Sequence, residues 1–191
     1  MSINNSAAER VPTREECHAL MDRYSMLPNI LSHSKQVMRV SLAITDNLTS
    51  GAAVNRNMVI AAALLHDITK TRSLQTKEPH DSSGGLLLRE LGYPCIAEII
   101  EQHVFFEGLN PHGNIEEREI IYYADKRVMH DKIVSVDERL RDLVKRYGST
   151  EMIRNRILRN RELILAIEHK IARFMKVDLH TAIEGLQKTS G

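Results

Sequence analysis

The feature that most constrains the fold is the segment 61–70, which reads Ala-Ala-Ala-Leu-Leu-His-Asp-Ile-Thr-Lys. It begins as an apolar run and ends in a histidine, a carboxylate and, three residues later, Lys70. A helix that is apolar on all sides belongs in a core. An ionised carboxylate at its end must be paired or bound to a metal, because an isolated buried charge is very costly. The segment therefore predicts one buried helix with a polar site at its C-terminal end.

Apolar residues elsewhere recur every three or four positions, which is the spacing of amphipathic helices. No segment shows regular two-residue alternation, so the sequence predicts an all-α fold. The polar segments 71–79 and 105–114 are expected to be loops that shape a substrate pocket. The expected helices are 14–24, 28–48, a central helix capped by Asn55 or Asn57, one between His80 and Gly92, one from Pro94 to His103, then 115–129, 136–147, 153–174 and a short last helix capped by Asp178.

The composition is that of an ordinary globular domain, since 42% of the 191 residues are hydrophobic and 27% are charged. The net charge of +1 gives no general attraction to nucleic acid or to an anionic membrane, and the lack of Trp argues against a base-stacking surface. No apolar run approaches the roughly 20 residues of a membrane span, and the N-terminus lacks the apolar stretch of a signal peptide. Cys17 and Cys95 form no CxxC pair, so we expect a reduced, cytoplasmic setting.

Five polar residues lie on helix faces that should point into the core. A single histidine in such a position is usually a core residue with its hydrogen bonds satisfied, but five polar side chains together favour a metal site. Asp125 is the hardest to explain otherwise, because a core carboxylate needs a partner. A buried network of His–Asp hydrogen bonds is the structural alternative. The five residues are His33, His66, Asp67, His103 and Asp125.

The order of these residues resembles a known family. His33, the pair His66-Asp67 and then Asp125, within the contexts Leu-Leu-His-Asp-Ile-Thr-Lys at 64–70 and Tyr-Ala-Asp-Lys at 123–126, are similar to the HD superfamily of metal-dependent phosphohydrolases. The resemblance covers roughly residues 28–139 and implies an all-helical bundle around a metal site. We therefore expect a flexible N-terminus at 1–12, an HD domain at 13–132, and C-terminal helices at 133–191 that pack on the same domain.

Two further histidines, His80 and His103, extend the resemblance to the binuclear members of the superfamily. These members include HDIG-type hydrolases and bacterial diadenosine tetraphosphate hydrolases. Imidazole and carboxylate ligands suit Fe, Mn, Co, Ni or Zn, so the implied cofactor is one or two divalent transition metal ions. His80 lies at a loop–helix boundary, where a surface capping role is the alternative. The ligands implied for the first ion are His33, His66, Asp67 and Asp125, and those for the second are His80, His103 and a bridging Asp67.

The resemblance implies hydrolysis of a phosphate ester or anhydride, with a nucleotide as the expected substrate. A bound metal lowers the pKa of its water and supplies hydroxide for attack on phosphorus. Asp67 and Lys70 are the expected catalytic residues. Lys70, Lys126 and Arg127 are candidates for contacts with substrate phosphate, and a solvated surface position is the alternative for each.

Two other functions stay open. Some HD-fold proteins, such as inositol oxygenases, hold a di-iron centre with the same type of ligand set, which predicts iron dependence and oxygen consumption. A domain that senses a nucleotide without turnover is the second alternative. The amphipathic helices after Val136 are then a candidate surface for a partner or a homodimer, although packing on the same domain is favoured. A second pair, His130-Asp131, has no apolar run leading into it, so we interpret it as surface.

Overall fold

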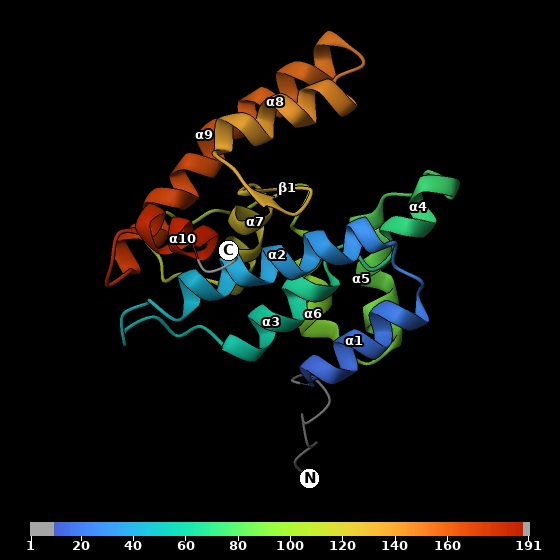
Figure 1. Ribbon diagram of the computed structural model, residues 1–191, viewed down its shortest axis with the longest axis horizontal. Coiled ribbons are helices and arrows are strands. Elements are labelled where there is room, and N and C mark those ends of the chain that lie inside the picture. Colours follow the sequence, from blue (N-terminus) through green and yellow to red (C-terminus); the bar gives the residue numbers. More distant parts are fainter. Residues whose placement is uncertain (1–9, 189–191) are drawn as a thin grey trace.

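The computed structural model describes residues 10–188, and the fold is almost entirely helical (Figure 1). The all-α prediction is confirmed, because the strands among these residues form no more than one short antiparallel hairpin. Most of the predicted flexible N-terminus at 1–12 lies outside the described residues. The elements are α1 (Arg14–Arg23), α2 (Pro28–Thr45), α3 (Arg56–Leu65), α4 (Lys70–Thr76), α5 (His80–Glu90), α6 (Pro94–Glu101), α7 (Glu117–Asp125), β1 (Val128–Met129), β2 (Lys132–Ile133), α8 (Val136–Tyr147), α9 (Glu151–Phe174) and α10 (Leu179–Lys188).

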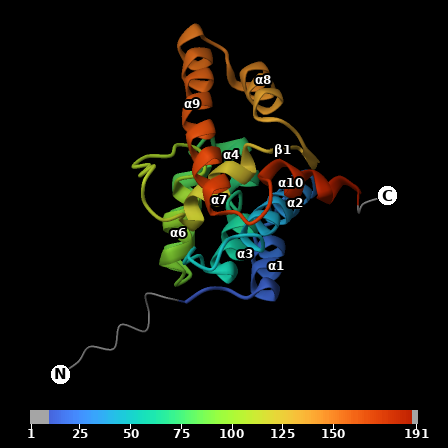
Figure 2. The ribbon, with the colours of Figure 1, turned by 90° about the vertical axis from the view of Figure 1, so that its left-hand side faces the viewer.

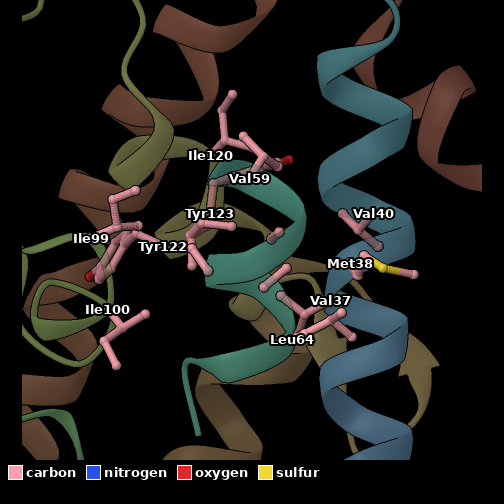
Figure 3. Packing of buried hydrophobic residues seen from close by; sticks show 14 of the residues in the cluster. Val37, Met38, Val40, Val59, Leu64, Ile99, Ile100, Ile120, Tyr122 and Tyr123 are labelled. Atoms are coloured by element: carbon pink, nitrogen blue, oxygen red, sulfur yellow. The ribbon is translucent and has the colours of Figure 1, made fainter. Parts of the chain in front are cut away.

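Helix α3 lies at the centre of the protein, as its apolar sequence predicts. Residues 61–65 have no exposed surface. Helix α2 packs along α3, which α1, α6 and α7 also contact. Figure 3 shows Val37 of α2 beside Leu64 of α3, with Tyr122 and Tyr123 of α7 on the opposite side. Three consecutive alanines leave room for neighbouring helices around α3, so the C-terminal end of this helix is held deep in the core.

Local signals set the helix boundaries. Thr13 and Glu16 form a capping box at the start of α1, and the Asn55 side chain accepts hydrogen bonds from two backbone N–H groups in the first turn of α3. Pro28 and Pro94 begin α2 and α6, where the missing N–H costs no helical hydrogen bond. These capping and starting positions agree with the sequence analysis.

Two boundary predictions are wrong. The segment 71–79, predicted as a loop, contains most of helix α4. Its large apolar side chain, Leu74, is 51% exposed, so α4 has no buried apolar face that periodicity could reveal. The helix predicted at 115–129 ends at Asp125, because the chain turns into the β1–β2 hairpin with His130 in the left-handed region (φ 57°).

Helices α8 and α9 run side by side and project from the rest of the protein (Figures 1 and 2). Helix α9 packs on α7, where Lys170 Nζ lies 2.6 Å from Glu119 Oε1 and both side chains are buried. The chain then returns to α2, since Lys176 N donates to Asn47 O and α10 packs on α2. The domain boundary at 132 stays a prediction. Within residues 10–188, every helix is too short or too polar to cross a membrane.

Candidate metal centre

Six ionisable side chains from five parts of the chain meet at the C-terminal end of α3. The structure thus brings together all six of the predicted ligands. His80 is partly buried and the other five are buried. Each side chain sits in or next to a helix that packs into the core, so packing of the helices fixes where the six groups meet. They are His33 in α2, His66 and Asp67 directly after α3, His80 at the start of α5, His103 after α6 and Asp125 at the end of α7.

The six side chains form two groups of three, His33–His66–Asp125 and Asp67–His80–His103. Within each group, the nitrogen and oxygen atoms that could ligate a metal lie within 4.8 Å of one another. Asp67 faces both groups: its Oδ2 lies 3.7 Å from His66 Nε2, and its Oδ1 lies 3.2 Å from His80 Nε2. This position suits a carboxylate that bridges two ions. The assignment of ligands to each ion stays a prediction.

Three of the imidazoles are oriented through Nδ1. His33 Nδ1 lies 2.8 Å from the carbonyl oxygen of His130, and His66 Nδ1 lies 2.8 Å from that of Ala63. His103 Nδ1 lies 2.5 Å from the carbonyl oxygen of Ile100. Donation from Nδ1–H to a carbonyl leaves Nε2 unprotonated, with its lone pair directed at the centre. Metal-binding histidines are commonly held in this way.

Polar atoms without hydrogen bonds provide a direct test of whether the site fits a metal. His66 Nε2 and Asp67 Oδ1 are both buried and have no hydrogen-bond partner. Buried polar atoms are nearly always satisfied, so two adjacent exceptions need a reason. His33 Nε2 lies 2.9 Å from Asp125 Oδ1, although both atoms act as acceptors when Nδ1 carries the proton. Divalent cations bound by the two groups would satisfy these atoms, so the residues fit the metal that the resemblance implies.

The protonation states also favour a metal. Burial lowers the pKa of His66 to about 3 and lowers that of His80, which keeps both imidazoles neutral. Burial alone would raise the pKa of Asp67, but the ammonium group of Lys70 opposes it, and the pKa lies well below its usual range. The charges of Lys126 and Arg139 likewise oppose burial at Asp125, whose pKa is also well below its usual range. Neutral imidazoles and ionised carboxylates are the forms that bind metal.

The three basic residues expected near the substrate lie in different surroundings. Lys70 Nζ is 2.9 Å from His80 Nε2 and 3.7 Å from Asp67 Oδ1, and the side chain lines a cavity beside the centre. Lys126 also lines this cavity, but it is buried and its ammonium group donates to Asp125 Oδ2 at 2.6 Å and to the carbonyl oxygen of His103 at 2.8 Å. Lys126 therefore holds a ligand in place.

Arg127 does not reach the cavity. Its guanidinium group donates to the carbonyl oxygen of Val134 at 2.8 Å and to the hydroxyl of Tyr123 at 2.7 Å, on the side of α7 that faces the hairpin. Arg127 is only 5% exposed, so the alternative of a solvated surface position is wrong. The structure does not bring this residue to the metal centre, because the end of α7 directs consecutive side chains to different sides.

The sequence analysis missed two contributors. Arg139 in α8 is buried, and its Nη2 lies 3.5 Å from Asp125 Oδ1. Nothing in its sequence context distinguishes it from the other arginines of that helix. His130, interpreted as surface, has a side chain outside the core, but its backbone oxygen orients His33. His130 has a positive φ of 57°, a backbone conformation that sequence spacing does not predict.

A cavity of about 550 Å³ opens beside the centre. Lys70 and Leu74 of α4 and Lys77 directly after it line one side of it, and α8 and α9 line another. A cavity of this size holds a small organic molecule. The metal centre forms a further side, where five of the six candidate ligands line the cavity: His33, Asp67, His80, His103 and Asp125.

Comparison with known proteins decides the family. A model of the HD domain matches residues 30–129, which is more than half of the chain and includes all six candidate ligands. The chain belongs to the HD domain family. HD domains are in general metal-dependent phosphohydrolases, and the His/Asp groups of this HD domain could hold such a metal.

The other comparisons add little about activity. An uncharacterized protein of Methanocaldococcus jannaschii is 28% identical over 153 residues, which span 73% of this chain and 88% of that protein. No solved structure matches this HD domain protein. The finer resemblance to diadenosine tetraphosphate hydrolases is not confirmed by these matches.

Proposed function

We propose that this HD domain protein hydrolyses a phosphate ester or anhydride, with a nucleotide as the favoured substrate, and that it uses one or two divalent transition metal ions. The observation that carries the proposal is the meeting of two three-residue groups of possible ligands at Asp67, where the buried atoms His66 Nε2 and Asp67 Oδ1 have no hydrogen-bond partner. A metal bound there supplies a water of lowered pKa and neutralises phosphoryl oxygens.

The side chains around the centre have distinct roles in this proposal. His33, His66, His80, His103 and the two carboxylates hold the metal. Lys70, whose side chain is 24% exposed and lines the cavity, binds an oxygen of the substrate phosphate. Lys126 and Arg139 orient Asp125 from two sides.

Positive charge in the cavity supports a phosphate substrate. Lys70 of α4 and Lys77 directly after it line the cavity, as do Arg146 and Arg156 of the C-terminal helices. An anionic substrate gains from such a lining, whereas the oxidation of an uncharged substrate by a di-iron centre does not need it. The same observation is compatible with a nucleotide sensor, so turnover must be measured.

Phosphate release from nucleotides, dinucleoside polyphosphates and simple esters, each with Mn, Fe(II), Co, Ni or Zn, tests the proposal. Wild type is compared with Asp67→Ala and with His112→Ala, which removes an exposed histidine outside the centre. We expect metal-dependent release that falls at least about a hundredfold in Asp67→Ala, because the loss of an outer partner of a metal ligand alone costs about 10–100-fold.

The control and the contrary results are distinct. His112→Ala should retain wild-type release. Release that survives in Asp67→Ala contradicts the assignment of the centre. Oxygen uptake with iron, without phosphate release from any substrate, indicates the oxygenase, and tight nucleotide binding without turnover indicates the sensor.

A further inference from the structure

The side of the cavity that faces the metal centre comes from α8 and α9, which follow the segment matched by the HD family. All six candidate ligands lie within residues 30–129, whereas this wall begins at Arg139 and ends at Ile164. The metal centre and the wall share one continuous cavity of about 550 Å³. A phosphate group bound at the metal centre would occupy only a part of that volume, so the remainder is available for the rest of a substrate.

The wall carries an apolar stripe. Ile164, Ile157 and Ile153 follow one another along one face of α9, and all three line the cavity. Ile164 is fully buried in the core, whereas Ile153 is 36% exposed. Leu143 and Tyr147 of α8 line the cavity beside them, and Tyr147 is 48% exposed. An apolar surface that lines a cavity beside a few charged groups is typical of a ligand-binding surface.

The wall also carries an excess of positive charge. Arg139 and Arg146 share one carboxylate, Asp142, at 3.0 Å and 3.1 Å. Arg156 lies over the ring of Phe105, 4.0 Å from its centroid, and no carboxylate pairs with it among residues 10–188. Asp142 is thus the carboxylate of α8 that two of these three guanidinium groups share, and Arg139 also lies 3.5 Å from Asp125 Oδ1. The side chain of Arg139 is more than nine-tenths buried, and its Nε has no hydrogen-bond partner.

We propose that this α8–α9 wall is a second subsite, which binds the part of the substrate that surrounds or follows the scissile phosphate. The chemistry of the wall selects a substrate with an apolar ring, which lies on Ile153 and Ile157, and a further negative charge, which pairs with Arg156. The inference rests on the proposed function, since it names what else a phosphorylated substrate must carry. The HD segment then supplies the reaction and the C-terminal helices select the substrate.

Three phosphonates test the subsite without turnover, because their C–P bonds are not hydrolysed. Methylphosphonate reaches only the metal centre, benzylphosphonate adds a ring, and 4-carboxybenzylphosphonate adds a second charge. Their affinities for the Mn²⁺-loaded protein are measured by calorimetry. We expect benzylphosphonate to bind at least about tenfold tighter than methylphosphonate, from burial of the ring. The added carboxylate should contribute about a further threefold.

Matched variants locate these gains. Ile157→Ser should abolish the difference in affinity between benzylphosphonate and methylphosphonate. Leu158→Ser, which alters a 50% exposed neighbour outside the cavity, should keep this difference. Arg156→Gln should abolish the additional affinity of 4-carboxybenzylphosphonate over benzylphosphonate. Arg159→Gln, at an exposed position outside the cavity, should keep it. Methylphosphonate affinity should stay the same in all four variants, which shows that the metal centre is intact.

Several results overturn the proposal. Equal affinities for methylphosphonate and benzylphosphonate in the wild type would overturn it. Tighter binding of benzylphosphonate than of methylphosphonate that persists in Ile157→Ser would also overturn it. A dimer in solution that Ile157→Ser converts to a monomer shows that a second copy of the chain covers the wall instead. Failure of the proposed function looks different: no substrate releases phosphate, while the phosphonate pattern remains.

Discussion

Replacement of Lys170 by methionine tests how the C-terminal helices are joined to the HD domain. Lys170 of α9 is 1% exposed, and its Nζ donates to Oε1 of the fully buried Glu119 at 2.6 Å. The other oxygen of Glu119 accepts the backbone N–H of Glu116. Glu119 lies in the first turn of α7, and the last residue of α7 is the candidate ligand Asp125. Lys170→Met retains an unbranched side chain but leaves the Glu119 carboxylate buried without a cation.

The expected loss of stability follows from this geometry. Breaking a buried ion pair costs about 3–5 kcal/mol, because one charge stays uncompensated. Glu119 keeps its hydrogen bond from Glu116, so we expect a value at the lower end, about 3 kcal/mol. A protein of this length loses about 2–4 °C in Tm for each kcal/mol, which predicts a decrease of about 6–12 °C. Glu119→Gln in the Lys170→Met background should recover much of the loss, because glutamine removes the charge and still accepts the hydrogen bond.

Urea unfolding followed by circular dichroism at 222 nm, in the presence of EDTA, measures these differences without a contribution from bound metal. Lys176→Met, the same change at an exposed lysine, is the matched control and should alter the unfolding free energy by less than about 0.5 kcal/mol. A loss below about 1 kcal/mol in Lys170→Met refutes the reasoning, as does a double variant no more stable than the single one. Either result means that α9 does not anchor on α7 through this pair.

Three further predictions concern the metal, Arg127 and the packing of α5. Metal at 100 times its Kd should raise Tm by about 5–11 °C in thermal unfolding, since binding to the native state contributes about 2.7 kcal/mol. The absence of a shift in wild type, or an equal shift in His66→Ala, contradicts the assignment of the metal centre. Arg127→Met should lower the free energy of unfolding in urea by about 1–3 kcal/mol, because its hydrogen bonds to Val134 and Tyr123 are lost. It should leave the KM for phosphate release unchanged, and a raised KM would indicate that Arg127 contacts the substrate. Gly84→Val should lower the free energy of unfolding by about 1–3 kcal/mol, because a Cβ added at this position would lie 3.2 Å from Ile100 Cδ1. An unchanged urea midpoint contradicts this tight packing of α5 on α6.

The sequence by itself determined the all-α fold and predicted the six candidate ligands that the structure brings together. Helical periodicity, capping residues and helix-starting prolines act within a few positions, so they can be interpreted locally. Five of the six candidate ligands are detectable for a different reason: an ionisable residue on an apolar face is costly unless it has a partner, so its presence there indicates a site. His80 lies at a loop–helix boundary, and only the family resemblance indicated it. Apolar spacing gives the side of a helix that is buried, and this spacing alone directs His33, His66 and Asp125 toward a common core.

Tertiary structure alone decided what surrounds that centre. Helix α4 has no buried apolar face, and its neighbours rather than its periodicity determine where it lies. Lys126 and Arg127 are adjacent and both basic, yet one holds Asp125 and the other binds the hairpin, because the end of α7 directs them to different partners. Arg139 and the α8–α9 wall reach the cavity from residues far along the chain. Residue type fixes which groups can bind a metal or a phosphate, but the direction of each long charged side chain depends on partners that only the packed helices bring within reach.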